Sequence, residues 1–482
     1  MTRVAFEAVG LGRALVLSDY HGLRRRFRDA AIYSSNDEAS MAASIQEALA
    51  NQATLEEAGC RLRQGLQKEH EEGVARLQDA MRRDGVPRAR RKQQRLLMIT
   101  QHPYPWNPTL RRNVDALTET GAHLDLICSM FDPTLTDRPD NLHIHTIPIA
   151  HRRHHPSRYV IEYAAFFLRS FLKVTTLSLR RRFDAVQVDN VPDFLVFAAW
   201  PARLRGARIV FFMYELMPEM TMARLHLHAS HPLVAVTRRF ERRAVQWSDA
   251  VVVVNEACRR NLLARGVDPA KVTVIPNTQP PRPLPARPAK DRPTLVTHST
   301  LIKRYGIDVA VRAFRELRSR WTDLSLLILG EGEELPALRE LAQTLGVAKD
   351  VHFRGVLPWA EAMAEIRTCT VGLVPVVDDG YGQLLLPMKL LDYTALGVPA
   401  VCSRLTAVAD YFPPDSLAYF APGDASALAK QVDRLLSDPA GAQRQASRAR
   451  EVALSIGWEK VLPQYLDIMA VRGNGRGRPR TT

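Results

Sequence analysis

Cysteine is scarce in this chain, and long apolar segments are missing. The 482 residues include five cysteines, which are far apart and lack the spacing of metal ligands or of a disulfide framework. No apolar run reaches the length of about eighteen residues that a transmembrane helix needs. Charged side chains interrupt the N-terminal region early, so we expect no secretory signal. These absences predict a cytoplasmic protein that holds no metal.

Acidic residues are fewer than basic ones. The sequence has 66 lysines and arginines against 51 aspartates and glutamates, which gives a net charge of +15. Such an excess favours an anionic partner: nucleic acid, a phospholipid surface or a phosphorylated substrate. No recognition motif or stacking platform for nucleic acid accompanies the charge, so we expect no nucleic-acid partner. Residues 471–482 are rich in glycine and arginine and too poor in apolar side chains to fold, which predicts a disordered basic tail.

Short apolar strands alternate with helical patterns along most of the chain. One series spans residues 95–279, and a second spans residues 293–470. Strands that are apolar throughout and alternate with helices are typical of a parallel sheet covered on both faces. The proline-rich residues 280–293 between the two series indicate a semi-rigid linker. The sequence therefore predicts an α/β fold with two Rossmann-like, doubly wound domains that face a cleft, where ligands bind at the carboxyl ends of the strands.

The first ninety residues repeat part of the second series. Residues 12–18 align with residues 397–403, and after a shift of one residue 32–33 and 39–40 align with 418–419 and 425–426. Both copies then run into a helical pattern. Short strand–helix units also resemble each other by chance, but the length of the parallel favours a duplication or a fusion remnant. Residues 1–90 are therefore predicted to form a small, partial, Rossmann-like α/β module without a catalytic role.

The segment Tyr381–Ser403 has the pattern of an anion site. Pro387 stands in the first turn of a predicted helix, Met388–Leu396, which Gly397 ends. A loop that opens onto a helix N-terminus can bind anions, because free N–H groups and the positive end of the helix dipole point at the ligand. Asp392, about one turn further along, could accept hydrogen bonds from sugar hydroxyls. The alternative is an ordinary helix whose proline and glycine only mark its ends.

A series of short motifs runs through both predicted domains. Residues 183–219 contain the first group, which consists of Asp184, Asn190, Pro192, Asp193, Gly206, Glu215, Pro218 and Glu219. The turn LILGEGEELP at residues 327–336 and the sequence KLLDY at residues 389–393 follow in the second domain. In these motifs, residues 95–469 resemble the family 4 glycosyltransferases of GT-B fold, in the group that assembles surface polysaccharides and glycoconjugates. By the same resemblance, residues 1–90 contain a remnant of a glycosyltransferase C-terminal domain.

The resemblance implies an activity. Members of this family move a sugar from a nucleotide donor to an acceptor with retention of anomeric configuration and without a metal. The chain is thus expected to be a hexosyltransferase-like enzyme whose donor is a substrate and which needs no cofactor. The donor binds mainly to the C-terminal domain and the acceptor to the N-terminal one. The implied acceptor is a lipid-linked or polysaccharide intermediate, handled at the inner face of the cell membrane.

The resemblance also assigns site residues. Glu215 and Glu219 are the candidate catalytic carboxylates, for acceptor binding or proton handling. For Glu219 the alternative is that it caps the following helix. The candidate donor-binding residues are His298, Lys303, Arg304, Gly330, Gly332, Gln383, Leu384, Lys389 and Asp392.

The chain departs from the family pattern in the loop that meets the diphosphate. The lysine that usually precedes the loop glycine is Tyr305 here, and the usual arginine is Thr300. Lys303 and Arg304 are nearby substitutes that would stabilise the departing diphosphate, because that charge needs a cation where no metal is bound. The alternative is that both are solvated loop cations.

A second departure concerns a pair of glutamates, which appear here as Leu384 and Asp392. The missing glutamate and the altered loop favour one rival interpretation, a non-catalytic scaffold on the same fold. A second rival is another enzyme with two Rossmann-like domains, such as a nucleotide-sugar epimerase. Charge alone supports a third, a nucleic-acid binder.

An aromatic-rich and mostly apolar helix is predicted at Tyr159–Leu179, followed by Arg180–Arg182. A helix of this kind can lie on an anionic membrane surface, and the alternative is a core helix of the N-terminal domain. Two histidine clusters, at residues 151–155 and 226–231, lack carboxylate or cysteine partners at useful spacing. We therefore predict solvated loops there rather than metal sites.

Overall fold

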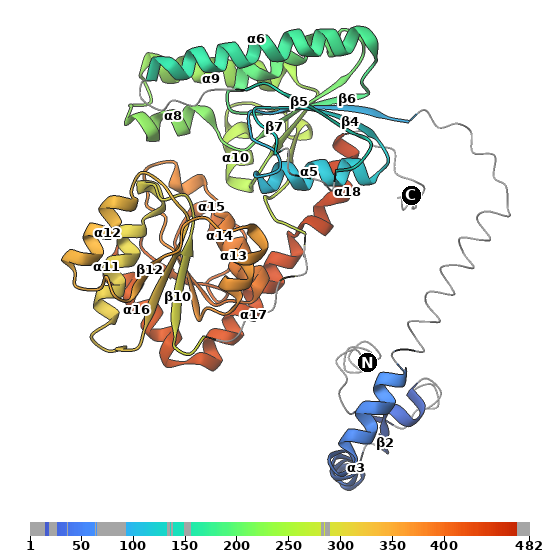
Figure 1. Ribbon diagram of the computed structural model, residues 1–482, viewed down its shortest axis with the longest axis vertical. Coiled ribbons are helices and arrows are strands. Elements are labelled where there is room, and N and C mark those ends of the chain that lie inside the picture. The colour runs from blue at the N-terminus through green and yellow to red at the C-terminus, as the bar shows by residue number, and fades with distance from the viewer. Residues whose placement is uncertain are drawn as a thin grey trace, which may run out of the picture. The chain divides into compact units, whose positions relative to one another are not determined.

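The computed structural model describes residues 15–18, 27–35, 37–62, 64, 93–132, 135, 138–148, 156–280, 284 and 290–469. The chain divides into two compact units, Met1–Lys92 and Gln93–Thr482 (Figure 1). The predicted basic tail and the histidine cluster at residues 151–155 lie outside the described residues. The sequence-based boundaries at residues 90, 95, 279, 293 and 470 stay predictions.

The described part of the first unit is a small strand–helix arrangement. β1 (Val16–Ser18) pairs in parallel with β2 (Ile32–Ser34), and η1 (Arg28–Ala30) lies between them in the sequence. α3 (Glu38–Ala50) begins after Asp37, whose side chain accepts a 2.8 Å hydrogen bond from the backbone N–H of Ser40. One apolar cluster consists of Leu15, Phe27 and Ala31, with Leu17, Tyr33 and Leu62 packed against it.

A seven-stranded parallel sheet forms the first half of the second unit. Its order is β5-β4-β3-β6-β7-β8-β9, so the strands run outward in both directions from the neighbours β3 and β6. The strands are β3 (Arg95–Ile99), β4 (His123–Cys128), β5 (Leu142–Thr146), β6 (Ala185–Asp189), β7 (Arg208–Met213), β8 (Ala250–Val253) and β9 (Val272–Val274). The helices are α5 (Pro108–Glu119), α6 (Pro156–Arg180), η2 (Asp193–Ala199), α7 (Trp200–Arg203), α8 (Met217–Leu225), α9 (Pro232–Trp247), α10 (Glu256–Ala264) and η3 (Pro269–Lys271).

The second half repeats this plan with six parallel strands in the order β12-β11-β10-β13-β14-β15. The strands are β10 (Thr294–His298), β11 (Ser325–Leu329), β12 (Val351–Phe353), β13 (Val371–Val374), β14 (Ala400–Ser403) and β15 (Ala418–Phe420). The helices are η4 (Lys303–Tyr305), α11 (Ile307–Leu317), α12 (Leu335–Thr344), α13 (Trp359–Arg367), η5 (Gly382–Leu384), α14 (Met388–Leu396), α15 (Thr406–Ala409), α16 (Ala425–Ser437), α17 (Pro439–Ser455) and α18 (Trp458–Ile468). None of the helices in the described residues is long and apolar enough to cross a bilayer.

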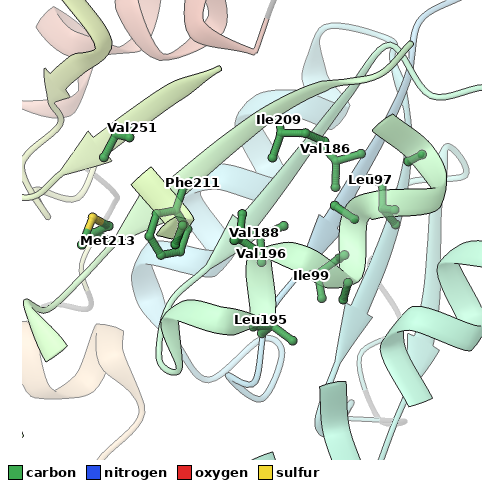
Figure 2. Close-up of a cluster of buried hydrophobic side chains, with 14 of the residues drawn as sticks. Leu97, Ile99, Val186, Val188, Leu195, Val196, Ile209, Phe211, Met213 and Val251 are labelled. Atoms are coloured by element: carbon green, nitrogen blue, oxygen red, sulfur yellow. The ribbon is translucent and has the colours of Figure 1, made fainter. Parts of the chain in front are cut away.

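Apolar side chains cover the strands of both sheets. In the first sheet, Leu97, Val186 and Phe211 belong to one cluster of buried residues (Figure 2). Leu96, Val210 and other neighbours in the sequence belong to a different cluster, because successive strand residues point to opposite faces. The second sheet has two such clusters as well. Two parallel sheets, each buried on both faces, confirm the predicted α/β fold with two Rossmann-like halves.

The final helix joins the two halves. After the second sheet is complete, α18 returns to the first half, where Trp458, Tyr465 and Ile468 pack in the same cluster as the strand residues. The Tyr465 hydroxyl donates a 2.7 Å hydrogen bond to the buried side chain of Gln187 on β6. The C-terminal part of the chain is therefore part of the core of the first half.

The predicted repeat has the same strand register in both places. β14 pairs with β15 so that Val401 lies opposite Ala418, and the alignment places Val16 and Ile32, which also lie opposite each other, at these positions. α3 and α16 each have 13 residues, and an aspartate caps each N-terminus. These shared features agree with a common origin, and the duplication itself stays a prediction.

Candidate functional site

A large cleft of about 1350 Å³ lies between the two halves of the second unit. Its walls are the loops at the carboxyl ends of strands, as expected for doubly wound sheets. From the first half, the lining includes Gln101 after β3, Asn190 after β6 and Glu215 after β7. From the second half, it includes the end of β10 and the start of α14.

Some of the predicted site residues line the cleft, and others do not. Glu215, His298, Leu384, Lys389 and Asp392 line it. Its lining does not include Glu219, Lys303, Arg304, Gly330, Gly332 or Gln383. The assignments of both groups to catalysis or donor binding stay predictions, and the contacts of each residue are described below.

Glu215 is held at the cleft by its backbone. The Asn190 side chain donates a 2.6 Å hydrogen bond to the Glu215 carbonyl and accepts one of 2.9 Å from the N–H of Tyr214. Burial raises the pKa of the Glu215 carboxyl, although the positive charges of Arg304 and Arg224 oppose that shift. A carboxyl with a raised pKa in a cleft is suited to accept or donate a proton.

Glu219 contacts other charged groups instead. It lies in the first turn of α8, and its carboxylate pairs with Arg265, which also pairs with the buried Glu241. No side-chain hydrogen bond of the capping type is formed at the start of α8. Arg265 thus links the two carboxylates.

His298 and Asp392 form a pair in the wall of the second half. Their Nε2 and Oδ2 atoms are 3.1 Å apart, and His298 Nδ1 is 3.2 Å from the Tyr393 hydroxyl. A carboxylate only accepts hydrogen bonds, so the Nε2 proton of His298 points at Asp392. The helix that carries Asp392 spans Met388–Leu396, as predicted. Pro387 was predicted in the first turn, but it is the N-cap residue just before the helix. Gly397 ends it with φ of 72°.

The two predicted loop cations differ in their surroundings. Arg304 donates a 2.6 Å hydrogen bond to Asp379 and lies 4.9 Å from the centre of the Tyr381 ring. Lys303, in the same short helix, has an exposed side chain. Gln383 binds Asp378 and the start of α15, through a 2.9 Å hydrogen bond from the N–H of Thr406.

Lys389 is the cation that lines the cleft from α14. Its side chain is buried, and its Nζ has no hydrogen-bond partner among the described residues. The Nζ lies 4.9 Å from the centre of the Tyr305 ring, and burial lowers its pKa to about 7.

Gly330 and Gly332 lie in the loop after β11. A Cβ atom on Gly330 would lie 1.9 Å from the carbonyl oxygen of Ser299, and one on Gly332 would lie 2.3 Å from that of Leu301. The loop after β11 therefore packs directly against the loop after β10, which contributes Ser299 and Thr300 to the lining. Glycine is required here by close contact between two backbones.

Several residues that line the cleft were not among the predicted site residues. Buried polar atoms without a partner among the described residues include Gln101 Nε2, Asn277 Oδ1, Gln279 Nε2 and Ser299 Oγ. Buried polar groups are normally hydrogen-bonded, so these atoms can bind water or a polar ligand in the cleft. His102 also lines the cleft, 5.1 Å from the Tyr214 ring, and burial lowers its pKa to about 4. The signal available for these residues was their position just after predicted strands.

No metal-ligating group of three or more His, Cys, Asp or Glu side chains occurs in the part of the chain that the structure describes. His226, His228 and His231 are exposed, and His231 caps the N-terminus of α9.

Two family models match the chain. Residues 106–278 match a "Glycosyl transferase 4-like domain", and residues 292–438 match "Glycosyl transferases group 1". Together these matches cover more than half of the chain, which therefore belongs to the family 4 glycosyltransferases with the GT-B fold. The family that the motifs indicated is thus confirmed.

Relatives with known names include two mycobacterial enzymes, both called GDP-mannose-dependent alpha-(1-6)-phosphatidylinositol monomannoside mannosyltransferase. The Mycolicibacterium smegmatis enzyme is 34% identical over 34% of this chain and 44% of its own length. The Mycobacterium tuberculosis enzyme is 30% identical over 44% of this chain and 55% of its own length. The chain thus spans about half the length of these relatives.

Solved structures share the fold. Sucrose-phosphate synthase from Thermosynechococcus elongatus has a TM-score of 0.63 and 18% identity, and covers 78% of this chain and 98% of its own. HepE of Anabaena, in complex with UDP-glucose, has a TM-score of 0.59 and 13% identity, and covers 78% of this chain and 99% of its own.

Proposed function

We propose that this protein transfers a sugar from a nucleotide-sugar donor to an acceptor hydroxyl, with retention of configuration and without a metal ion. The observation that carries the proposal is one cleft lined by the Glu215 carboxyl on one side and the His298–Asp392 pair on the other. In this reaction, the bond between the sugar C1 and the diphosphate breaks, the acceptor oxygen bonds to C1, and its proton leaves. Glu215 is the group that we assign to that proton.

The donor class is supported by the relatives. The mycobacterial enzymes are named for GDP-mannose, and HepE was crystallised with UDP-glucose. We place the donor on the second half, where Asp392 and His298 would bind hydroxyl groups of the ribose or the sugar. The unpartnered atoms of Ser299 and Lys389 in the same wall are free to bind its phosphates.

We further propose a lipid-linked or polysaccharide acceptor handled at an anionic membrane surface. The names of the mycobacterial relatives include a phosphatidylinositol mannoside. In this chain, α6 buries Phe166 and Val174 in the core and exposes Leu168 and Leu172, which are 56% and 57% accessible. One face of this helix is therefore packed in the core, and the other is exposed.

Aromatic side chains connect α6 to α9 through η2, against which both helices pack. The rings of Phe167 on α6 and Phe194 on η2 are 5.8 Å apart, and those of Phe194 and Phe240 on α9 are 5.6 Å apart. Phe240 is exposed, and so are Arg239 and Arg243 on the same helix. Apolar side chains among arginines are what an anionic lipid surface attracts.

The test is donor turnover. Purified protein is incubated with GDP-mannose, UDP-glucose and other nucleotide-sugars, and the release of nucleoside diphosphate is measured with and without a chelator. We expect release with at least one donor, unchanged by the chelator, and a product with the anomeric configuration of the donor. Release that depends on an added metal would contradict the proposed metal independence. Inversion of configuration would contradict the proposed retaining mechanism.

A non-catalytic scaffold is the second candidate, because Leu384 stands where the family has a glutamate. Its carbonyl accepts a 2.8 Å hydrogen bond from Asn255 of the first half, so this residue joins the two halves. Nucleotide binding without turnover of any donor would favour the scaffold. Conversion of the sugar without release of nucleotide would favour an epimerase.

A further inference from the structure

Lys389 is a buried lysine for which the described residues supply no counter-charge. It is the second residue of α14, it is 4% exposed, and its Nζ has no hydrogen-bond partner among the described residues. Lysine is almost never fully buried unless it is paired. Because Lys389 also lines the cleft, its partner can be a bound ligand.

The groups around Lys389 do not neutralise it. α14 packs against α13, α17, β13 and β14, and the described titratable group on these elements that acts on the Lys389 charge is the Cys402 thiol of β14. Burial raises the pKa of that thiol far above neutral, and burial also raises the pKa of Tyr305, whose ring faces the amine from η4. Both groups are therefore uncharged near pH 7.

The two loop cations that the sequence predicted for the diphosphate are less well placed. Arg304 already pairs with Asp379, and Lys303 is exposed outside the lining of the cleft. Tyr305 occupies the position in which the family has its lysine, and the Lys389 amine reaches the ring of this tyrosine from another element.

We propose that Lys389 is the group that receives the donor's diphosphate and that it takes up a proton when the donor binds. This inference rests on the proposed function, since it assumes a nucleoside-diphosphate ligand. In the free protein near pH 8, the amine is held neutral by its burial. A diphosphate beside it favours the charged form, so binding and protonation occur together. Above pH 7, affinity then falls as the pH rises, by up to about tenfold per pH unit.

The experiment is calorimetric titration of the full chain with GDP and with UDP at pH 8.5. Each titration is repeated in two buffers of different ionisation enthalpy, which gives the number of protons taken up. We expect close to one proton per nucleotide for the wild type and none for Lys389→Met. The substitution should also weaken binding by about 10- to 100-fold, as the loss of a charged hydrogen bond does. The matched control is Lys430→Met, on the exposed face of α16, which should behave as the wild type.

Binding of either nucleotide to the wild type without proton uptake overturns the inference, and this result needs no variant. Proton uptake that persists in a folded Lys389→Met protein also overturns it. If that variant does not fold, Lys389→Gln and the pH dependence of the wild-type Kd test the same point, and a Kd constant between pH 7 and 9 refutes it. If neither nucleotide binds the wild type, the proposed function itself fails.

Discussion

Gly330 combines an unusual backbone conformation with a close contact. Its φ is 126°, and a Cβ atom there would lie 1.9 Å from the carbonyl oxygen of Ser299. We predict that Gly330→Ala lowers the free energy of unfolding by at least about 2 kcal/mol, because strain of about 1–3 kcal/mol is added to a displaced loop. Urea denaturation measures this change.

The control for this substitution is Gly346→Ala. Gly346 has φ of 68°, but no heavy atom lies within 4 Å of the added Cβ. It should cost only the conformational part, about 1–2 kcal/mol. If both substitutions lower the free energy of unfolding by the same amount, the close contact with Ser299 does not contribute to the effect at Gly330.

Glu215 should control the pH dependence of transfer. Burial raises the pKa of its carboxyl above the ordinary value of 4.5, and a proton acceptor works only when ionised. Activity is therefore predicted to fall as the pH drops through this raised pKa. Glu215→Gln should lower kcat by about 10²- to 10⁴-fold and remove this acid limb.

The measurement is a kcat profile across pH for the wild type and the variant. Glu340→Gln, an exposed position on α12, is the control and should keep the wild-type profile. A Glu215→Gln protein with the same acid limb would assign the proton transfer to another group.

Sequence motifs identified cleft residues where the family pattern places a side chain at or just after the end of a strand, or in the first half of a helix. Glu215, His298, Lys389 and Asp392 are such cases, and all four line the cleft. The pattern could not show which of the two loop cations forms an ion pair, because Lys303 and Arg304 are neighbours in one short helix. In the fold, Arg304 pairs with Asp379 and Lys303 is exposed. Gln101 belongs to no motif; an unpartnered buried atom distinguishes it, and burial is a property of the folded chain.

At the scale of elements, proline and glycine residues predicted where a helix begins and ends. α14 matches its predicted range because a proline and a glycine mark its ends. α6 was ambiguous for a physical reason: apolar residues cover most of its circumference, so periodicity does not separate the packed face from the exposed one.

The exposed face of α6 leads to a prediction about membranes. The protein should bind vesicles rich in anionic lipid at low salt and be released at high salt, because ions screen surface charge within about 8 Å at physiological ionic strength. Leu168→Ser with Leu172→Ser should weaken this binding at least about tenfold, since each leucine contributes about 1.5–3 kcal/mol when fully buried. Co-sedimentation with vesicles measures both effects.

Leu454→Ser is the matched control, because Leu454 is 59% exposed on α17, in the other half. It should leave vesicle binding unchanged. If the wild type does not bind anionic vesicles even at low salt, peripheral attachment through this face is refuted.

At the scale of the whole molecule, the two sheets followed from the alternation of apolar strands and helices, but the contacts that join the halves did not. Arg112 on α5 is buried, donates hydrogen bonds to the carbonyls of Pro276 and Thr278, and lies 4.0 Å from the centre of the Trp458 ring. A buried arginine that holds the connecting segment and the last helix is invisible to periodicity, because its partners are far away in the sequence.

The last prediction concerns the first unit. Both large sheets, their four apolar clusters and the described residues that line the cleft lie within Gln93–Thr482. A protein shortened to begin at Arg91 should therefore fold and keep its donor turnover within about a factor of two, the scatter that we allow for independent units. A second shortened protein, beginning at Met98, removes most of β3 from the centre of the first sheet and should not fold. Melting curves and nucleotide release are measured for both. If the protein that begins at Arg91 is folded but has lost turnover, residues 1–90 take part in catalysis, and their interpretation as an inert remnant is wrong.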